Sequence, residues 1–239
     1  DLQSNDRTGV FSALSGIPYR AGNHPRFPYN RHPTTNYNGE CHSFDRLNQI
    51  IISAGIEPAQ PLPYLPVPES TEKKISEWIK EHDLYKEKFV ILHAGSSPIH
   101  LNKRWPYFKE LALKLKNKFK IVWIGGADDI ELNTLLSKTT GINATNAFSI
   151  LELVAIGKHA KFAVTNDSAP MHILSCSQIP IFGLFGPTYP RRTHALGQIE
   201  NVISANKIMA INDADFKPAN MSDISLEMVL EKLELANLI

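Results

Sequence analysis

Short apolar runs alternate with amphipathic segments from about residue 71 to the end of the chain. The apolar runs have the length of buried strands, and in the other segments apolar residues recur every three or four positions, as on helices. Strands that alternate with helices predict βαβ units and a parallel sheet with helices on both faces. The predicted strands cover 89–94, 119–126, 161–166 and 179–186, and the predicted helices cover 71–82, 106–118, 129–138, 149–160, a segment from about Ser168, and 223–236.

The first 58 residues have a less regular pattern. Val10, Phe11 and Leu14 have helical spacing, and a second helix is predicted over 43–56 with Gly55 as its cap. Residues 20–40 between them are rich in Asn, His, Pro, Arg and Gly, which predicts a long surface loop. The closely spaced prolines of 57–70 disfavour both helices and central strands, so this segment predicts a linker between two domains.

Composition narrows the class of protein. Of the 239 residues, 43% are hydrophobic and 21% are charged, which is typical of a globular protein and excludes disordered and collagen-like chains. The formal net charge of +1 provides no broad basic surface for nucleic acid. No apolar run approaches the roughly 20 residues that span a bilayer. The two cysteines cannot form a disulfide framework, which favours a reducing cytosol.

The segment "TNDSAPMH" (165–172) follows a predicted strand and opens a predicted helix. Free backbone N–H groups and the helix dipole make such a position suitable for an anion. Asp167 or Ser168 can cap the helix, Pro170 suits its first turn, and His172 can reach the same anion. The alternative interpretation is a capped helix with a semi-buried histidine and no ligand.

Two further loops follow predicted strands. The segment 93–106 combines the hydroxyls of Ser96 and Ser97 with the charge of Lys103, a set suited to phosphate. The segment 125–131 places Asp128 where it can accept hydrogen bonds from a ribose. The alternatives are a solvated Lys-Arg pair beside a buried tryptophan, and an acidic first helical turn that complements the helix dipole.

Carboxyl ends of parallel strands meet at one edge of the sheet, so the three loops together predict a site for a nucleotide-like anion. They do not by themselves indicate a reaction. The chain has no P-loop, no G-x-G-x-x-G and no G-x-S-x-G segment. The nine histidines have no metal-ligand spacing, so no metal site is predicted.

These segments in combination resemble glycosyltransferase family 9, the heptosyltransferases of lipopolysaccharide inner-core assembly. The family pattern D-[ST]-G-x-x-H matches Asp167, Ser168 and His172, with Ala169 where glycine is usual. The family's K-x-W-P motif matches 103–106, and "FGPTYP" resembles its "FGPTDP". "FSILELVAIGKHAKFAVTND" resembles the stretch before the D-[ST]-G motif, and "DLQSNDRTGVFSALSG" resembles part of the family's N-terminal domain.

The resemblance implies an α/β fold of the GT-B type with two Rossmann-like domains. It implies a partial acceptor-side domain with its linker at 1–68, a complete nucleotide-sugar-binding domain at 69–218, and a final helix within 219–239 that packs back toward the N-terminal domain. The family's first strand, glycine-rich loop and proposed acceptor base lie upstream of anything that resembles Asp1. We therefore expect the start of the N-terminal domain to be missing, and we assign no catalytic base.

The resemblance also implies roles for individual residues. Ser96, Ser97 and Lys103 would hold the donor phosphates, and Lys103 would stabilise the departing diphosphate. Asp128 would meet the ribose, and the backbone near Phe148 would meet the base. The residues that would cradle the pyrophosphate are Asp167, Ser168, Ala169, Met171 and His172.

The implied reaction is the inverting transfer of a heptose from ADP-heptose to the lipopolysaccharide inner core, with no metal or other cofactor. The implied partners are an ADP-sugar donor and a lipopolysaccharide core or lipid A-linked acceptor, and not nucleic acid. The implied location is the cytoplasm, with a peripheral contact at the cytoplasmic face of the inner membrane. Two alternatives stay open: a nucleotide-binding module without transfer activity, and another GT-B nucleotide-sugar enzyme such as an epimerase.

Overall fold

The computed structural model describes residues 1–34, 41–205 and 216–239. Its backbone divides into two compact units. The smaller unit contains Asp1–Pro61 together with Arg191–Thr193, and the larger unit contains the rest of the described chain. The first division falls inside the proline-rich segment, while the three-part domain assignment made from the sequence stays a prediction.

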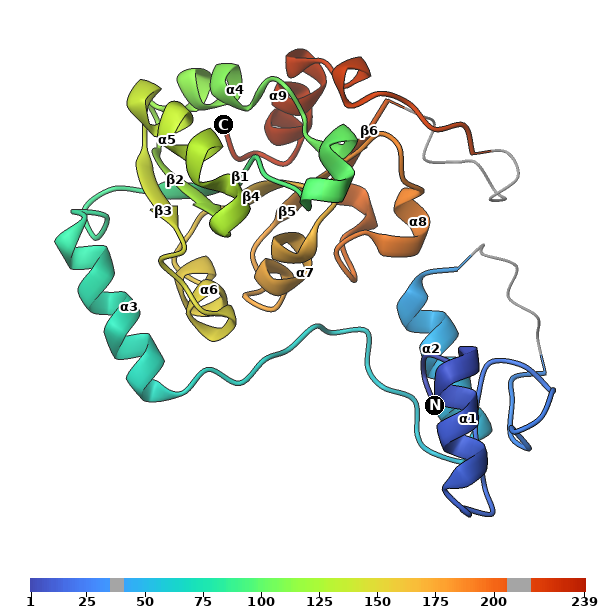
Figure 1. The fold of residues 1–239 in the computed structure, drawn as a ribbon. Helices are drawn as coiled ribbons and strands as arrows, with labels where there is room; N and C mark the ends of the chain where they lie inside the picture. Colours follow the sequence, from blue (N-terminus) through green and yellow to red (C-terminus); the bar gives the residue numbers. More distant parts are fainter. Residues whose placement is uncertain (35–40, 206–215) are drawn as a thin grey trace. The chain divides into compact units, whose positions relative to one another are not determined.

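The larger unit is built on a six-stranded sheet in which all paired strands are parallel (Figure 1). The four strands predicted from apolar runs are present, which confirms the α/β class. Two strands were missed. One has 4 residues with polar positions among them (INAT), and the other has only 3 residues (VIS), so neither forms a distinct apolar run. The strands are β1 (Phe89–His93), β2 (Lys120–Gly125), β3 (Ile142–Thr145), β4 (Ala163–Asn166), β5 (Ile181–Phe185) and β6 (Val202–Ser204).

The strand order is β3-β2-β1-β4-β5-β6, the order of a Rossmann-type sheet. Strands β2 and β3 therefore lie on one side of β1, and β4, β5 and β6 lie on its other side. At this reversal, His93 at the end of β1 is paired with Thr165 of β4, so the loops that leave both strands start side by side. Ligands of open α/β sheets bind at such a point, outside the carboxyl ends of the strands.

Helices cover both faces of the sheet, giving three layers (Figure 1). Val90 and Leu92 pack toward α4, α5 and α9, while Phe89 and Ile91 pack toward α3, α6 and α7, as the alternation of side chains along a strand requires. The helices of this unit are α3 (Glu69–Glu81), α4 (Phe108–Leu115), α5 (Ile130–Thr139), α6 (Ile150–Gly157), α7 (Ala169–Ser175) and α9 (Leu226–Leu235), with α8 (Pro190–Thr193) at the unit boundary and 3-10 turns η1 (Pro98–Lys103), η2 (Ala127–Asp129), η3 (Ile199–Asn201) and η5 (Met221–Asp223).

Helix α6 begins with a capping box that also ties it to α3. The Ser149 hydroxyl accepts from the Glu152 N–H, and the Glu152 carboxylate accepts from the Ser149 N–H at 2.7 Å. The same carboxylate forms an ion pair with Lys74 of α3. These contacts lower the pKa of Glu152 to about 2, with the hydrogen bond from Lys74 as the largest cause.

Helix α9 belongs to the larger unit. Its buried residues Val229 and Leu233 join the core on the α4 side, and the helix also contacts β6. Just before it, the Ile224 carbonyl accepts a hydrogen bond of 2.8 Å from the Trp105 indole. The expected packing of this helix toward the N-terminal domain stays a prediction.

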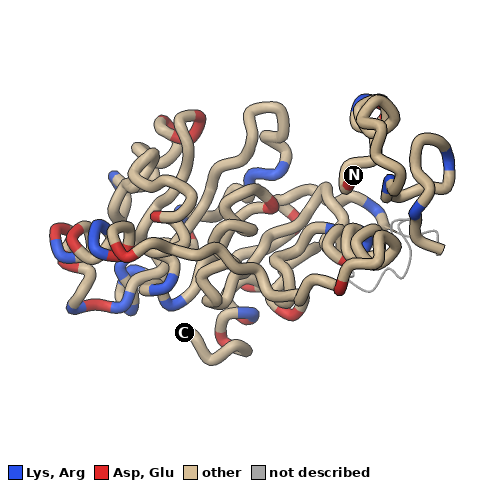
Figure 2. Tube along the Cα trace, turned by 90° about the horizontal axis from the view of Figure 1, so that it is seen from below, with Lys and Arg blue, Asp and Glu red and all other residues tan. Residues whose placement is uncertain are grey.

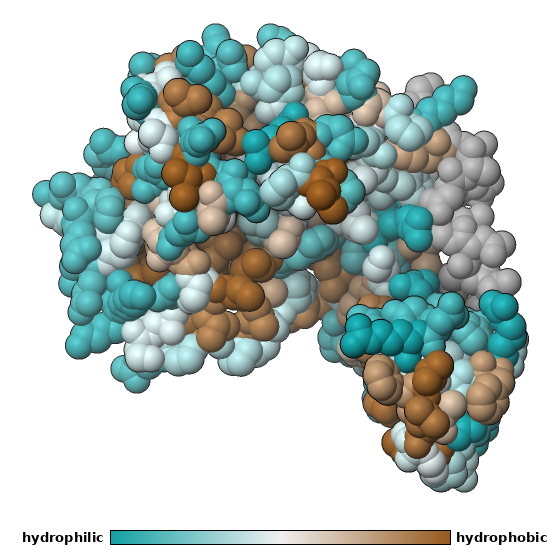
Figure 3. All heavy atoms as spheres, viewed as in Figure 1, coloured by the Kyte–Doolittle hydropathy of each residue, from teal (hydrophilic) through white to brown (hydrophobic). Residues whose placement is uncertain are grey.

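The smaller unit contains α1 (Asp6–Leu14) and α2 (Ser43–Ser53). Gly55 has a φ of +78°, so the predicted glycine cap after α2 is confirmed. Tyr29 is buried in this unit, where its hydroxyl donates to the Asp1 carboxylate. The apolar face predicted for the first helix is exposed instead, with Phe11 61% and Leu14 79% accessible, and apolar surface is visible on this unit in Figure 3.

Charged residues of both signs follow one another along the same segments of the chain (Figure 2). Helix α3 is an example, because its first turn carries Glu69 and Glu72 and its last turn carries Lys80. In the described part of the chain, no helix is long and apolar enough to cross a membrane.

Candidate functional site

Asn166, the last residue of β4, organises the loops at the carboxyl edge of the sheet. Its side-chain amide donates to the carbonyls of Ala94 and Gly95, each at 2.9 Å, and its carbonyl accepts from the Trp105 N–H at 3.1 Å. The side chain is fully buried, so each of these bonds replaces a contact with water. The sequence analysis did not single out Asn166. This one side chain fixes the loop after β1 and the segment before α4 in relation to β4.

Lys103 and Asp167 come together at this edge, as the motifs predicted. The Lys103 ammonium lies 2.7 Å from Asp167 Oδ2, and the Thr188 hydroxyl donates to the same oxygen at 2.7 Å. A carboxylate can only accept hydrogen bonds, so Asp167 is unsuited to bind a phosphate directly. Its position instead holds the Lys103 cation in place, and the ammonium has further hydrogens to offer a ligand.

Helix α7 begins at this point with Ser168 as its N-cap residue and Pro170 in its first turn, as expected. The expected side-chain cap is absent: neither Asp167 nor Ser168 closes the helix end with its side chain. Asp167 is bonded to Lys103 and Thr188, while the Ser168 hydroxyl lies 3.1 Å from His93 Nδ1 and 3.3 Å from the Asn166 carbonyl. Both side chains are therefore directed to other partners at the edge.

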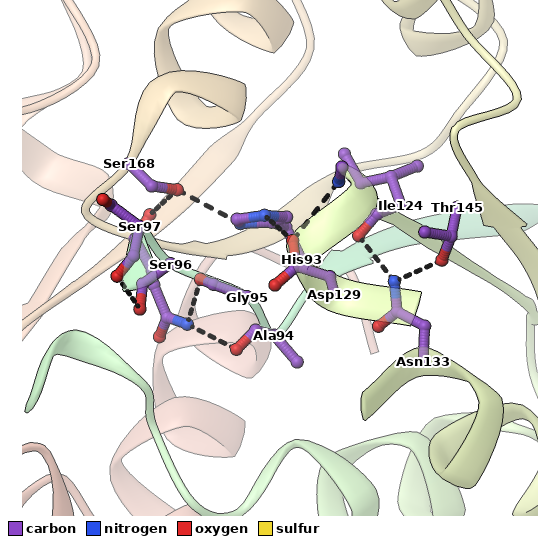
Figure 4. Close-up of polar contacts among 12 residues, drawn as sticks. His93, Ala94, Gly95, Ser96, Ser97, Ile124, Asp129, Asn133, Thr145 and Ser168 are labelled. Atoms are coloured by element: carbon purple, nitrogen blue, oxygen red, sulfur yellow. Dashed lines mark hydrogen bonds and ion pairs between the residues drawn. The ribbon is translucent and has the colours of Figure 1, made fainter. Parts of the chain in front are cut away.

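A second polar cluster surrounds Asp129, which the sequence analysis passed over in favour of its neighbour Asp128 (Figure 4). Asp129 Oδ1 accepts from the Arg104 guanidinium at 3.0 Å, and Oδ2 accepts from the Gly126 N–H at 3.3 Å. His93 Nε2 lies 3.6 Å from Oδ2. The carboxylate and the imidazole are both buried, while Arg104 is partly exposed.

The charge state of Asp129 follows from these partners. Burial acts to raise the pKa of its carboxyl. The hydrogen bond and charge of His93, the Gly126 N–H and the Arg104 guanidinium together outweigh burial and bring the pKa below its ordinary value of 3.8. Asp129 is therefore an anion at neutral pH, and it faces the buried ring of His93.

Gly95 makes room for this carboxylate. A Cβ at position 95 would lie 2.2 Å from both Asp129 oxygens, closer than any side chain can approach. His93 escaped the sequence analysis because it ends an apolar run and reads as part of the strand. The signal was available in the sequence as a histidine at the end of a buried strand with a glycine two residues later.

Of three further expected ligand residues, one differs in its surroundings from what the motifs implied. Ser96 is buried, and its hydroxyl donates to the His100 carbonyl at 3.0 Å, so its one hydrogen closes its own loop. Ser97 and Asp128 are exposed at the carboxyl edge, Ser97 just before η1 and Asp128 on η2. Ser96 therefore has no hydroxyl hydrogen left to donate to a phosphate, which argues against its expected role. The roles of Ser97 and Asp128 stay predictions.

The remaining residues of the motif lie on α7. Ala169 and His172 are exposed, as a ligand-binding role requires. The Met171 side chain is fully buried beside Gly183, and its backbone N–H donates to the Ser168 carbonyl. Met171 therefore contributes to the core, and its thioether cannot cradle a pyrophosphate.

An apolar pocket of about 170 Å³ lies beside the Asp129 cluster, between the ends of β2 and β3 and helices α6 and α7. Phe148 forms part of its wall and is fixed by an edge contact with Trp78 at 5.0 Å between ring centroids. The pocket is lined by Ile124, Gly125, Gly126, Ala144, Phe148, Ser149, Ile150, Leu153, Pro170 and Ile173. A flat, mainly apolar group can enter here, within the same edge as Lys103.

The model of one protein family, described as glycosyltransferase family 9 (heptosyltransferase), matches residues 45–217. The chain belongs to this family. Every residue of the two polar clusters lies within the matched range, so the family 9 match covers the whole carboxyl edge described above.

Two sequence relatives are heptosyltransferases. The lipooligosaccharide heptosyltransferase 2 of Haemophilus influenzae is 25% identical over 187 residues, 72% of this chain and 54% of the relative. The lipopolysaccharide heptosyltransferase 2 of Salmonella typhimurium is 30% identical over 145 residues, 55% of this chain and 42% of the relative. The chain spans about half the length of these relatives.

Solved structures show the same fold. The family 9 glycosyl transferase of Veillonella parvula matches with a TM-score of 0.77 at 23% identity, over 97% of this chain and 70% of that one. The E. coli ADP-heptose lps heptosyltransferase II matches with a TM-score of 0.68 at 22% identity, over 96% and 72%. These neighbours are GT-B glycosyltransferases, which confirms the fold class implied by the motifs.

Proposed function

We propose that this chain carries the donor-binding part of a heptosyltransferase. The donor is a nucleotide-diphosphate heptose, with ADP-heptose as the expected compound, and the acceptor is the lipopolysaccharide inner core. The names of the relatives support this choice, since they are lipopolysaccharide or lipooligosaccharide heptosyltransferases. The observation that carries the proposal is the position of Lys103, a cation held by Asp167 and Thr188 beside the start of α7.

In this proposal the adenine and the diphosphate of the donor bind to different surfaces of the carboxyl edge, one apolar and one polar. The apolar pocket beside Phe148 receives the adenine, because a flat ring gains most from an apolar slot. Lys103, the Ser168 hydroxyl and the exposed His172 meet the diphosphate, as charged and hydroxyl donors suit phosphate oxygens.

The reaction is a displacement at the anomeric carbon with inversion. The bond between that carbon and the diphosphate oxygen breaks, and a bond to an acceptor hydroxyl forms as the hydroxyl loses its proton. Negative charge grows on the departing diphosphate, and Lys103 stabilises it without a metal ion. No base for the acceptor hydroxyl is assigned among the described residues.

Binding of ADP tests the role of Lys103. We expect Lys103→Ala to weaken ADP binding by about 1.5–3 kcal/mol, because it removes a charge-assisted contact to phosphate. Titration calorimetry measures the effect, with Lys109→Ala as the matched control because Lys109 is an exposed lysine of α4. Equal ADP affinities of the wild type and Lys103→Ala would remove Lys103 from the site.

The transfer itself has a separate test. The protein is incubated with ADP-heptose and a truncated lipopolysaccharide core acceptor, and the glycosylated product is measured by mass spectrometry. We expect product only when both substrates are present. ADP binding without any product would support the nucleotide-binding module, and conversion of the donor without an acceptor would support an epimerase.

A further inference from the structure

His93 lies between Ser168 and Asp129 in a chain of polar contacts (Figure 4). Its Nδ1 is 3.1 Å from the Ser168 hydroxyl, and its Nε2 is 3.6 Å from Asp129 Oδ2. The ring is only 3% exposed, so bulk water cannot replace either partner. This buried histidine has no part in the donor site proposed above, although it touches a hydroxyl of that site.

The charged groups around the ring are few in the described chain. Asp129 faces Nε2, and Arg104 balances part of its charge through a 3.0 Å contact. On the other side Ser168 is neutral, and its neighbour Asp167 is paired with Lys103. The ring therefore meets one ionised carboxylate on one side and a neutral hydroxyl on the other.

These neighbours determine which nitrogen carries the hydrogen. A neutral imidazole has one N–H and one acceptor nitrogen, and an anion beside Nε2 stabilises the hydrogen on Nε2. Nδ1 is then an acceptor. The Ser168 hydroxyl lies 3.1 Å from Nδ1 and 3.3 Å from the Asn166 carbonyl, and its single hydrogen points to the nearer Nδ1, which has lost its own hydrogen. In this state the hydroxyl offers only lone pairs to its open side.

A phosphate needs the opposite arrangement. Its oxygens at neutral pH accept hydrogen bonds, so a hydroxyl that shows them lone pairs repels them. If His93 binds a proton at Nδ1, the ring donates to Ser168 Oγ. The hydroxyl hydrogen then leaves Nδ1 for the Asn166 carbonyl or, when a diphosphate is bound, for a phosphate oxygen. Asp129 stays ionised and stabilises the resulting imidazolium.

We propose that His93 is a positioning residue that makes Ser168 a donor toward the diphosphate, and that it takes up a proton when the diphosphate binds. The proton moves from solvent to Nδ1, and the hydroxyl hydrogen changes its acceptor from Nδ1 to a phosphate oxygen. No covalent bond to a heavy atom forms or breaks. The inference rests on the proposed function, because the diphosphate is that of the nucleotide sugar.

Calorimetry with ADP-heptose in the absence of acceptor tests the proton uptake. This diphosphate is esterified at both ends and has no proton that titrates near neutral pH. At pH 8, in buffers of different ionisation enthalpy, the wild type should take up close to one proton per ligand. Its affinity should then fall by up to about tenfold for each further pH unit, as linkage to one proton requires.

Two variants separate positioning from a merely structural role. His93→Asn puts an amide donor near the position of Nδ1, so it should bind ADP-heptose with no proton uptake and a flat pH profile. Ser168→Ala keeps the histidine but removes the hydroxyl, and it should also lose the uptake. Uptake that persists in either variant would overturn the proposal. His172→Gln is the control, because uptake that disappears only in this variant belongs to His172 and also overturns the proposal.

The hydrogen positions have a test that needs no ligand. Nitrogen-15 NMR of the free protein at pH 8 should show His93 with its hydrogen on Nε2 and an acceptor Nδ1. A neutral ring with its hydrogen on Nδ1 would overturn the proposal whether or not nucleotides bind. If ADP-heptose fails to bind the wild type while the Nε2–H form is observed, the proposed function fails and the Ser168–His93 arrangement stands.

Discussion

Two aspartates at the same edge of the sheet are held in different ways. Asp129 is enclosed by Arg104, His93 and the Gly126 N–H. Of these partners, the His93 ring is buried and the Gly126 N–H belongs to the backbone. Asp167 is bonded to the flexible Lys103 side chain and to the Thr188 hydroxyl. Both carboxylates are shielded, and both of their cations have long stems and partly exposed side chains. Only Asp129 also faces a buried ring, that of His93.

The two ion pairs have the same chemistry, an aspartate with a cation, but different roles are expected for them. Loss of the Asp129 charge leaves the Arg104 guanidinium without its counter-charge and the buried Nε2–H of His93 without its anionic neighbour. Loss of the Asp167 charge frees Lys103 to extend into water. We therefore expect the Asp129 cluster to contribute mainly to stability and the Asp167 cluster mainly to ligand binding.

The largest expected effect breaks both clusters at once. Asn166→Ala removes three buried hydrogen bonds and leaves the Ala94 and Gly95 carbonyls and the Trp105 N–H unsatisfied. We expect a loss of about 3–4 kcal/mol in the free energy of unfolding. Urea denaturation measures it, and a loss below about 1 kcal/mol would show that water replaces the amide.

Matched substitutions at the two aspartates sharpen the comparison. Asp129→Asn should lower the free energy of unfolding by about 2–3 kcal/mol, because the buried His93 imidazole and the partly exposed Arg104 guanidinium lose their anion. Asp167→Asn should cost about 1 kcal/mol or less, since Lys103 can turn to solvent and an amide can still accept from Thr188. Denaturation of both variants in the same buffer decides, and equal losses would contradict the distinction.

The pH dependence of Asp129 gives the sign of its contribution. Its pKa in the folded protein is lower than its ordinary value of 3.8, so the ionised form stabilises the fold above that pH. The stabilisation is lost as the pH falls through the folded value. The part of the wild-type stability that comes from the Asp129 charge should therefore shrink as the pH falls below about 4, which unfolding of the wild type and Asp129→Asn in the same acidic buffers measures.

The smallest effect is expected at Glu152, the carboxylate in the capping box of α6. Glu152→Gln retains the capping hydrogen bond to Ser149 and loses only the ion pair to the exposed Lys74, so we expect about 0.5 kcal/mol. Since the folded pKa is about 2 and the ordinary value is 4.5, this contribution disappears as the pH falls between these values. If thermal denaturation shows a loss above about 2 kcal/mol, the size of the stability loss does not follow the burial of the substituted side chain.

The sequence predicted the frame of the larger unit well because apolar runs mark central strands directly. It also brought Lys103, Asp167 and Ser168 together, since each follows a strand that ends at the same edge. The edge strands β3 and β6 were missed, because they are short and carry little apolar signal.

The Asp129 cluster could not be predicted for a different reason. Asp128 and Asp129 are equivalent in the sequence, and only the packing of η2 against Gly95 decides which of them is buried. His93 likewise reads as one more residue of a buried strand until its ring is seen between Ser168 and Asp129. Pattern identifies the edge of the sheet, whereas tertiary packing decides which polar side chains point inward there.

The bonds made by Asn166 and Lys103 also have a kinetic consequence. Asn166 reaches back 72 residues to Ala94, and Asp167 reaches back 64 residues to Lys103. Contacts so distant along the chain form late, after the loops between them have closed. A chain that has assembled only β1, β2 and β3 therefore lacks the proposed nucleotide site, and we expect the first appearance of ADP affinity during refolding to report the docking of β4.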